Sequence, residues 1–383
     1  MNHCHGIAIH FILEPVRQKV LEQAKLGYNQ LIRFRSGSMV NFMMRTDVAM
    51  SGCRLVKIVA GLLLLMSAYP SNARNTLEEL LKEPFFSPSD IEEVRSGGFG
   101  VAKVHEVSDR EIAVAIACLV KGPPSDALSP FLGDKLPIDD KLLLDQGMVD
   151  SELYETSFAA ISLGKDGQDE AQHYLEARPG LGLNLTMDEI KTFQALSSST
   201  AVDQVERLLE SMLQTRYLAY RRDGLAGALP YARESGEHVS PGEELRKSEK
   251  DIKWLHELYP TFHNAWLSYP HNLPDEITGE DFFWAKLNIE DRPVFVLAHR
   301  LEASNENMHL VGIRDYYISH FFDVSQRAAV VTQLESGDQL LIYVERAWVD
   351  YWSGFASLSR KIGQKMLLKQ MEHLLEDHGI CGK

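Results

Sequence analysis

The spacing of apolar and polar positions changes along the chain, and each spacing predicts a different element. Residues 101–107 alternate between the two kinds, a turn follows at Asp109 and Arg110, and residues 111–120 are almost wholly apolar. Alternation with period two predicts a half-buried strand, and a short apolar run predicts a fully buried one. We therefore expect a hairpin near the start of the folded protein.

The middle of the chain has the longer period of helices. Thr186 followed by Glu189 has the pattern of a capping box, which stabilises a helix start. Further on, apolar residues recur every three or four positions along one helical side. We predict a helical insert over about 186–270, with helices at 187–196, 201–222 and 243–259.

The last third of the chain changes character again. It predicts five successive strands, at 282–288, 294–303, 308–322, 328–334 and 339–349. A final amphipathic helix is predicted at 357–378. Together these elements predict an α+β fold with an N-terminal hairpin, central helices and a C-terminal antiparallel sheet with a long terminal helix.

An apolar run at 58–69 has the features of an export signal. Arg54 and Lys57 precede it, and Ser71 and Ala73 follow at the positions of small residues before a cleavage site. As a helix the run spans about 18 Å, short of the roughly 30 Å of a bilayer core, so an uncut anchor is the weaker reading. We interpret 50–73 as a signal peptide cleaved after Ala73, and 74–383 as the mature, periplasmic or secreted protein.

The signal lies behind 49 further residues, an unusual place for one. Our hypothesis is that translation begins at Met50 or nearby and that residues 1–49 are an extension outside the true protein.

Charge is distributed unevenly. Residues 1–73 hold eight basic and three acidic side chains, which leaves 31 basic and 51 acidic residues in the rest, a net charge near −20. Such an acidic body argues against binding to nucleic acids and to anionic lipid surfaces. Two cysteines remain after Ala73, Cys118 and Cys381, and we expect a buried thiol and a tail thiol rather than a disulfide.

Two segments resemble a family of uncharacterised exported proteobacterial proteins. The first contains Tyr317, Ser319 and His320, and the second runs through Arg346 and Asp350 to Gly354. Family members have a tyrosine–serine–histidine strand and then an asparagine–arginine strand, whereas this chain has glutamate at 345. The resemblance implies export and one shared architecture, and it brings no activity. The predicted element order also resembles the helix-grip fold of START-like lipid-binding domains, a likeness of fold alone.

Familiar catalytic motifs are absent. His256-Glu257 and His263 do not form a zinc motif, because the histidines are seven residues apart with Pro260 between them. The glycines at 97–100 lead into a strand, whereas a phosphate-binding loop leads into a helix. We predict no metal site and no cofactor.

The candidate site comes from polar and aromatic residues on the predicted strands. With period two, Arg346 lies at the end of an apolar row and needs a partner, for which Asp323, Asp350 or Glu302 are available. The functional interpretation is a cavity between the sheet and the terminal helix, and the structural interpretation, which we favour, is a salt bridge with tyrosine hydroxyls capping the sheet edge. The candidate ligand-binding residues are Trp284, His299, Tyr317, His320, Arg346 and Asp350.

Three functions remain open at this point. The first is a periplasmic protein that binds an apolar or amphipathic small molecule, including a lipid, in that cavity. The second is a hydrolase-like enzyme in which His299 or His320 acts as a base oriented by Asp350 or Asp323. The third is an envelope assembly or scaffold protein. The ligand, the partners and the oligomeric state are not determined by the sequence.

Overall fold

The structure is a computed structural model of the chain. It describes residues 76–82, 86–164, 167–180, 182–197, 201–251, 253–271, 273–349 and 356–381, which belong to one compact unit, Arg74–Lys383. The predicted extension (1–49), the predicted signal peptide (50–73) and Asp350 lie outside the described residues. Among the described residues, no helix is long and apolar enough to cross a membrane.

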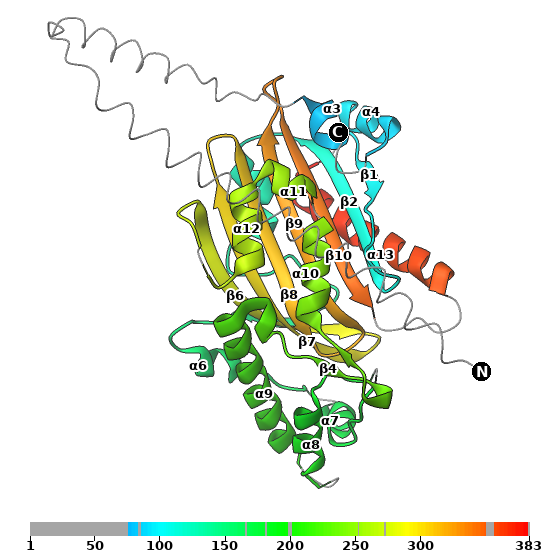
Figure 1. The fold of residues 1–383 in the computed structure, drawn as a ribbon, viewed down its shortest axis with the longest axis vertical. Helices are drawn as coiled ribbons and strands as arrows, with labels where there is room; N and C mark the ends of the chain where they lie inside the picture. The colour runs from blue at the N-terminus through cyan, green and yellow to red at the C-terminus, as the bar shows by residue number, and fades with distance from the viewer. Residues whose placement is uncertain are drawn as a thin grey trace, which may run out of the picture. The chain divides into compact units, whose positions relative to one another are not determined.

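An antiparallel sheet of eight strands forms the centre of this unit (Figure 1). Its strand order is β1-β2-β10-β9-β8-β7-β6-β3, so the first hairpin lies beside the last strand. The strands are β1 (Gly100–Lys103), β2 (Glu111–Val120), β3 (Leu143–Met148), β6 (Ile277–Ile289), β7 (Arg292–Ser304), β8 (Met308–Ile318), β9 (Phe322–Gln333) and β10 (Gln339–Val349). A separate pair consists of β4 (Tyr231–Ala232) and β5 (His238–Val239). The predicted α+β fold is confirmed.

Both faces of the sheet are covered. In β10, Leu341 and Tyr343 belong to one apolar cluster, whereas Leu340, Ile342 and Val344 belong to another. Because side chains alternate between the faces of a strand, a strand that is apolar at almost every position must be buried on both. This is the reason for the continuous apolar runs in the sequence.

One face packs against α13 (Ala356–Asp377), the predicted terminal helix. Leu367, Met371 and Leu375 of α13 join this cluster, which also includes α5 (Pro124–Leu128). We call this the α13 face. A disulfide between Cys118 of β2 and Cys381, just beyond α13, ties the helix end to the sheet. The prediction of two free thiols was wrong, because packing of α13 on β2 brings their Cα atoms to 5.9 Å.

The opposite face, which we call the insert face, is covered by helices from the segment between β3 and β6. Figure 1 shows α10 to α12 crossing it, with α13 behind the sheet. The helices of this segment are α6 (Tyr154–Phe158), α7 (Gly167–Leu175), α8 (Met187–Gln194), α9 (Val202–Asp223), α10 (Pro241–Asp251), α11 (Lys253–Leu258) and α12 (Pro260–Ser268). Two short helices nearer the N-terminus, α3 (Leu77–Lys82) and α4 (Pro88–Arg95), pack against the same face. The helical segment therefore starts earlier than predicted, at Tyr154.

Local signals in the sequence set two of these helices. Thr186 and Glu189 form the predicted capping box of α8, with the Thr186 hydroxyl accepting from the Glu189 amide at 3.1 Å. The helix α9 ends at Gly224, whose φ of 57° belongs to the region that favours glycine. Its buried side carries Arg216 and Tyr220 as well as apolar residues, and these two side chains reach the polar clusters described next.

Candidate functional site

Four polar side chains lie in one row across the insert face, on four neighbouring strands. Cα pairing places Arg346 of β10 opposite Gln326 of β9, Gln326 opposite Arg314 of β8, and Arg314 opposite His299 of β7. All four side chains are buried. We call them the polar row. A polar group buried in an apolar layer destabilises the fold unless it forms a hydrogen bond or an ion pair. The partners of the four side chains therefore decide which of their atoms remain available to a ligand.

Arg346 pairs with Glu111 of β2. Its Nη1 lies 2.6 Å from Oε1 of Glu111, and its Nη2 donates to the His105 carbonyl at 3.2 Å. The predicted partners Asp323 and Glu302 were wrong. The reason is the pairing of β10 with the distant β2, which puts Glu111 diagonally opposite Arg346.

Arg314 is held by an aromatic pair. Its Nη1 donates to the Tyr220 hydroxyl and to the Trp266 carbonyl, both at 3.2 Å. The guanidinium also lies 4.0 Å from the centre of the Trp266 ring, a favourable cation–π distance. These contacts connect β8 to α9 and α12.

His299 continues this chain of contacts towards the surface. Its Nδ1 lies 3.2 Å from the Tyr220 hydroxyl, and its Nε2 lies 3.5 Å from Oε1 of Glu280. Burial lowers the pKa of His299 to about 4, and Glu280 only partly opposes this, so the ring is neutral at neutral pH. A neutral ring accepts at one nitrogen and donates at the other, which fits Tyr220 on one side and a carboxylate on the other.

Glu280 is the end of the chain that water reaches. Its side chain is one-third exposed, at 33%, and it lies in an open groove of about 450 Å³ lined by residues 273–275 and 277–280. Burial alone would raise the pKa of Glu280, but hydrogen bonds from His299 and Tyr269 lower it. The carboxylate is therefore ionised at neutral pH and faces the groove.

Aromatic side chains cover the polar row. Phe262 and Trp266 of α12 stack at 5.6 Å between ring centres, and Trp266 also stacks on His299 at 5.7 Å. Trp254 of α11 adds a third ring, and with Phe262 and Trp266 it lines a cavity of about 10 Å³ above Gln326 and Arg346. We call these three rings the aromatic roof. The cavity has room for about one water molecule.

The structure places Trp284, Tyr317 and His320 outside the polar row, and Asp350 lies outside the described residues. His320 is buried in the turn between β8 and β9, where its Nδ1 lies 2.9 Å from the Ser319 hydroxyl, and burial lowers its pKa to about 3. Trp284 lies in β6, within the apolar cluster around α9. Of the predicted residues that the structure describes, the polar row therefore unites His299 and Arg346, and it does so on the insert face, opposite α13. The predicted cavity between the sheet and the terminal helix was placed on the wrong side for these two residues.

Tyr317 illustrates why strict alternation failed. The pairing of β7 with β8 shifts register between Leu297 and Ala298, so that Tyr316 is an extra residue. Tyr316 and Tyr317 both join the cluster on the insert face, whereas period two puts them on opposite faces. Tyr316 stacks on Tyr220 at 3.9 Å, and Tyr317 packs under the Arg216 guanidinium at 4.2 Å.

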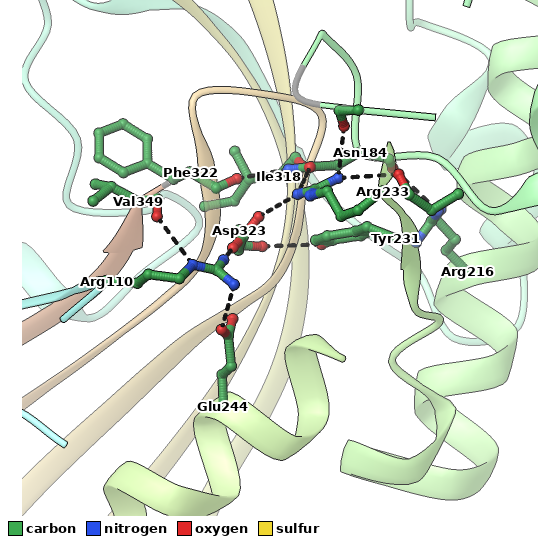
Figure 2. Close-up of polar contacts among 12 residues, drawn as sticks. Arg110, Asn184, Arg216, Tyr231, Arg233, Glu244, Ile318, Phe322, Asp323 and Val349 are labelled. Atoms are coloured by element: carbon green, nitrogen blue, oxygen red, sulfur yellow. Dashed lines mark hydrogen bonds and ion pairs between the residues drawn. The ribbon is translucent and has the colours of Figure 1, made fainter. Parts of the chain in front are cut away.

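A second polar cluster surrounds Asp323 at the start of β9. Figure 2 shows its carboxylate between Arg110 and Arg233. Arg233 Nη2 lies 2.6 Å from Asp323 Oδ1, and Arg110 forms an ion pair with the same carboxylate and lies 3.1 Å from Glu244 of α10. Asn184 accepts from Arg233 at 2.7 Å. Asp323 thus ties two arginines to the sheet, whereas the hydrolase hypothesis had Asp350 or Asp323 orienting a histidine.

The α13 face has its own charged residues, at the position after the polar row on β7, β8 and β9 (Arg300, Asp315 and Arg327). Arg327 donates to both oxygens of Asp315 at 3.0 Å, and Arg300 lies 2.5 Å from Asp281 and 3.1 Å from Glu302. Glu302 is therefore engaged on the face opposite to Arg346. These arginines are each paired with carboxylates, and we interpret these charged residues as structural.

Sequence reasoning missed Glu111, Tyr220, Trp254, Glu280 and Gln326. Their roles depend on which strands pair and which helices pack, and no local pattern marks them. Within the described residues, no group of three or more histidine, cysteine, aspartate or glutamate side chains is arranged to hold a metal ion. Comparison of the chain with protein-family models and with curated proteins finds no match to either.

Proposed function

We propose that the protein is exported and binds a small apolar or amphipathic molecule between the insert face and helices α10 to α12. The observation that carries this proposal is the polar row beneath the aromatic roof. Ligand sites are mostly apolar with a few convergent polar groups, and this layer has that composition. The predicted sequence features of export support the location, as does the Cys118–Cys381 disulfide, a bond typical of oxidising compartments.

The same layer supports binding better than catalysis. A general base must come within hydrogen-bond reach of its substrate. The His299 ring is fully buried and is packed against Trp266, Tyr269 and Phe282. Its contacts with Tyr220 and Glu280 fix the ring and hold the row in place. We therefore assign His299 a positioning role.

Binding requires the roof to separate from the sheet, because the cavity of about 10 Å³ holds no more than a water-sized group. Gly312 of β8 lies directly under the roof. A Cβ atom added there would stand 2.7 Å from Cζ of Phe262 and 3.5 Å from the Trp266 ring. Gly312 thus lets the roof approach the strand closely, and a side chain at this position occupies the space that a ligand needs.

Native mass spectrometry of the protein purified from the periplasm, paired with analysis of its organic extract, tests the proposal. We expect a bound molecule that is released on denaturation, and we expect the Gly312→Ala variant to lose at least tenfold in occupancy. Gly182→Ala is the matched control, since a Cβ there meets no atom within 4 Å. A wild-type protein that carries no ligand and takes up none from an apolar extract of its host would refute the proposal.

A further inference from the structure

Four residues that line the same cavity have a buried polar atom without a hydrogen-bond partner. One of them, Arg327, directs its side chain to Asp315 on the α13 face, and the other three have their side chains on the cavity side of the sheet. The unpaired atoms of these three are Nε1 of Trp254, Oε1 of Gln326 and Nε of Arg346. The three side chains are 4%, 4% and 2% exposed. Nearly all buried polar atoms in native proteins are paired, so three unpaired atoms around one space indicate a group that belongs there.

The neighbouring contacts fix which atoms face the cavity. Nε2 of Gln326 donates to the Ser248 hydroxyl, and that hydroxyl donates to the Leu245 carbonyl at 3.1 Å. The amide oxygen of Gln326 is therefore the atom left for the cavity. The two Nη atoms of Arg346 are used by Glu111 and His105, which leaves Nε.

The cavity thus presents two donors, the N–H groups of Trp254 and Arg346, and one acceptor, the oxygen of Gln326. A hydroxyl group is the complement of this set, because it accepts two hydrogen bonds and donates one. A carboxylate has no hydrogen to give to Gln326, and an ammonium group cannot accept from Trp254 or Arg346. Water also fits, with one hydrogen left over.

We infer that this cavity is a binding site for a single hydroxyl group, occupied by water in the free protein and by the alcohol of the ligand in the complex. The second half rests on the proposed function, and it narrows the ligand to an apolar molecule that carries an alcohol. The cavity of about 10 Å³ matches one oxygen atom. The apolar body of the ligand then lies against Phe262 and Trp266.

The water arm of the test uses the free protein. Labelling with ¹⁵N-tryptophan resolves the indole N–H of Trp254, which we expect to show a nuclear Overhauser effect to a long-lived water molecule. The signal is assigned by its loss in Trp254→Phe, and it should disappear on saturation with 1-dodecanol. Absence of the water signal from the free protein would overturn the site.

The ligand arm compares 1-dodecanol with its methyl ether, which accepts but cannot donate, and with dodecanoate, which has no hydrogen at neutral pH. We expect the alcohol to bind roughly 3- to 10-fold more tightly than the ether, the effect of one neutral hydrogen bond. Trp254→Phe should weaken alcohol binding by a similar factor. Trp284→Phe makes the same chemical change away from the cavity and should have no effect.

The outcomes separate the two proposals. Equal affinities for alcohol and ether, unchanged by Trp254→Phe, would overturn the hydroxyl site in the ligand complex while the proposed function stands. If none of the three probes binds, a panel of other apolar alcohols is tested next. Failure of the whole panel to bind would count against the proposed function. In that case a water signal at Trp254 would confirm the cavity as a water site only. Circular dichroism and thermal unfolding of each variant check that it is folded.

Discussion

Replacing Asp323 with asparagine is the sharpest test of how the helical insert is held to the sheet. The carboxylate is completely buried, and it neutralises Arg233, whose side chain is only 8% exposed, together with Arg110. Asparagine has nearly the same shape, so the substitution removes the charge and leaves the packing. The Arg233 guanidinium then remains buried without the charge of the Asp323 carboxylate.

The expected cost follows from what each arginine keeps. Arg110 is partly exposed and retains Glu244 at 3.1 Å, so its loss is small. The acceptors that Arg233 retains include the neutral Gly180 carbonyl at 3.0 Å and the Asn184 side chain at 2.7 Å. Removing one partner of a buried ion pair typically costs 3–5 kcal/mol. We expect a loss at the lower end, about 3 kcal/mol in the free energy of unfolding, because these acceptors remain.

Urea unfolding at pH 7, followed by circular dichroism, measures this loss. With an m-value of about 3 kcal/mol/M, the midpoint should fall by about 1 M. The control is Asp203→Asn, which breaks an exposed pair with Arg207 and should cost less than about 1 kcal/mol. If Asp323→Asn unfolds within 1 kcal/mol of the wild type, the Asp323 cluster does not hold the insert in place, and our account of Figure 2 is wrong.

Two further predictions concern the disulfide and pH. Reducing the Cys118–Cys381 bond, which closes a separation of 263 residues, should lower the free energy of unfolding by about 3–5 kcal/mol. A variant with serine at both positions should be equally destabilised and insensitive to reductant. A wild-type protein whose unfolding is unchanged by reductant would contradict this prediction. Burial lowers the pKa of His299 to about 4. Between about pH 4 and 6.5 this side chain therefore binds fewer protons in the folded protein than in the unfolded chain. Its contribution to stability is full above that window and is lost as the pH falls through it. One histidine contributes up to about 1.4 kcal/mol per pH unit to the slope of the unfolding free energy against pH. His299→Gln should remove that part of the slope in urea titrations at pH 4.5–7. An identical slope in the variant would show that His299 is not buried as a neutral ring.

The fold class was predictable because it rests on local periodicities. Strands that are apolar on nearly every position, and the helix at α13, showed their period in the sequence itself. The limits of β8 and β9 were less predictable. Phe321 adopts a positive φ of 69° and turns the chain between them, whereas the sequence reads as a continuous strand to residue 322. A non-glycine residue in this region follows from tertiary contacts and has no reliable local signal.

The candidate site was predictable only in part. His299 and Arg346 attracted attention because polar residues in an apolar strand need partners, and both proved to be buried and paired. The face of the sheet on which they lie, and the residues they pair with, could not be derived from the sequence. Period two relates residues within one strand, but the choice of which face receives α13 and which receives the insert depends on packing between distant segments.

The sequence by itself determined the types of the elements that it predicted, the capping box of α8 and the full burial of β2, because these depend on residues a few positions apart. Only the tertiary structure decided that Arg346 meets Glu111, that Cys118 meets Cys381, and that Trp254, Gln326 and Arg346 surround one cavity. Glu111 and Arg346 are 235 residues apart, the two cysteines are 263 apart, and Trp254 comes from a helix 72 residues before Gln326. Their meeting is fixed by strand register and helix docking, which are set by the burial of the whole apolar core and not by any local pattern.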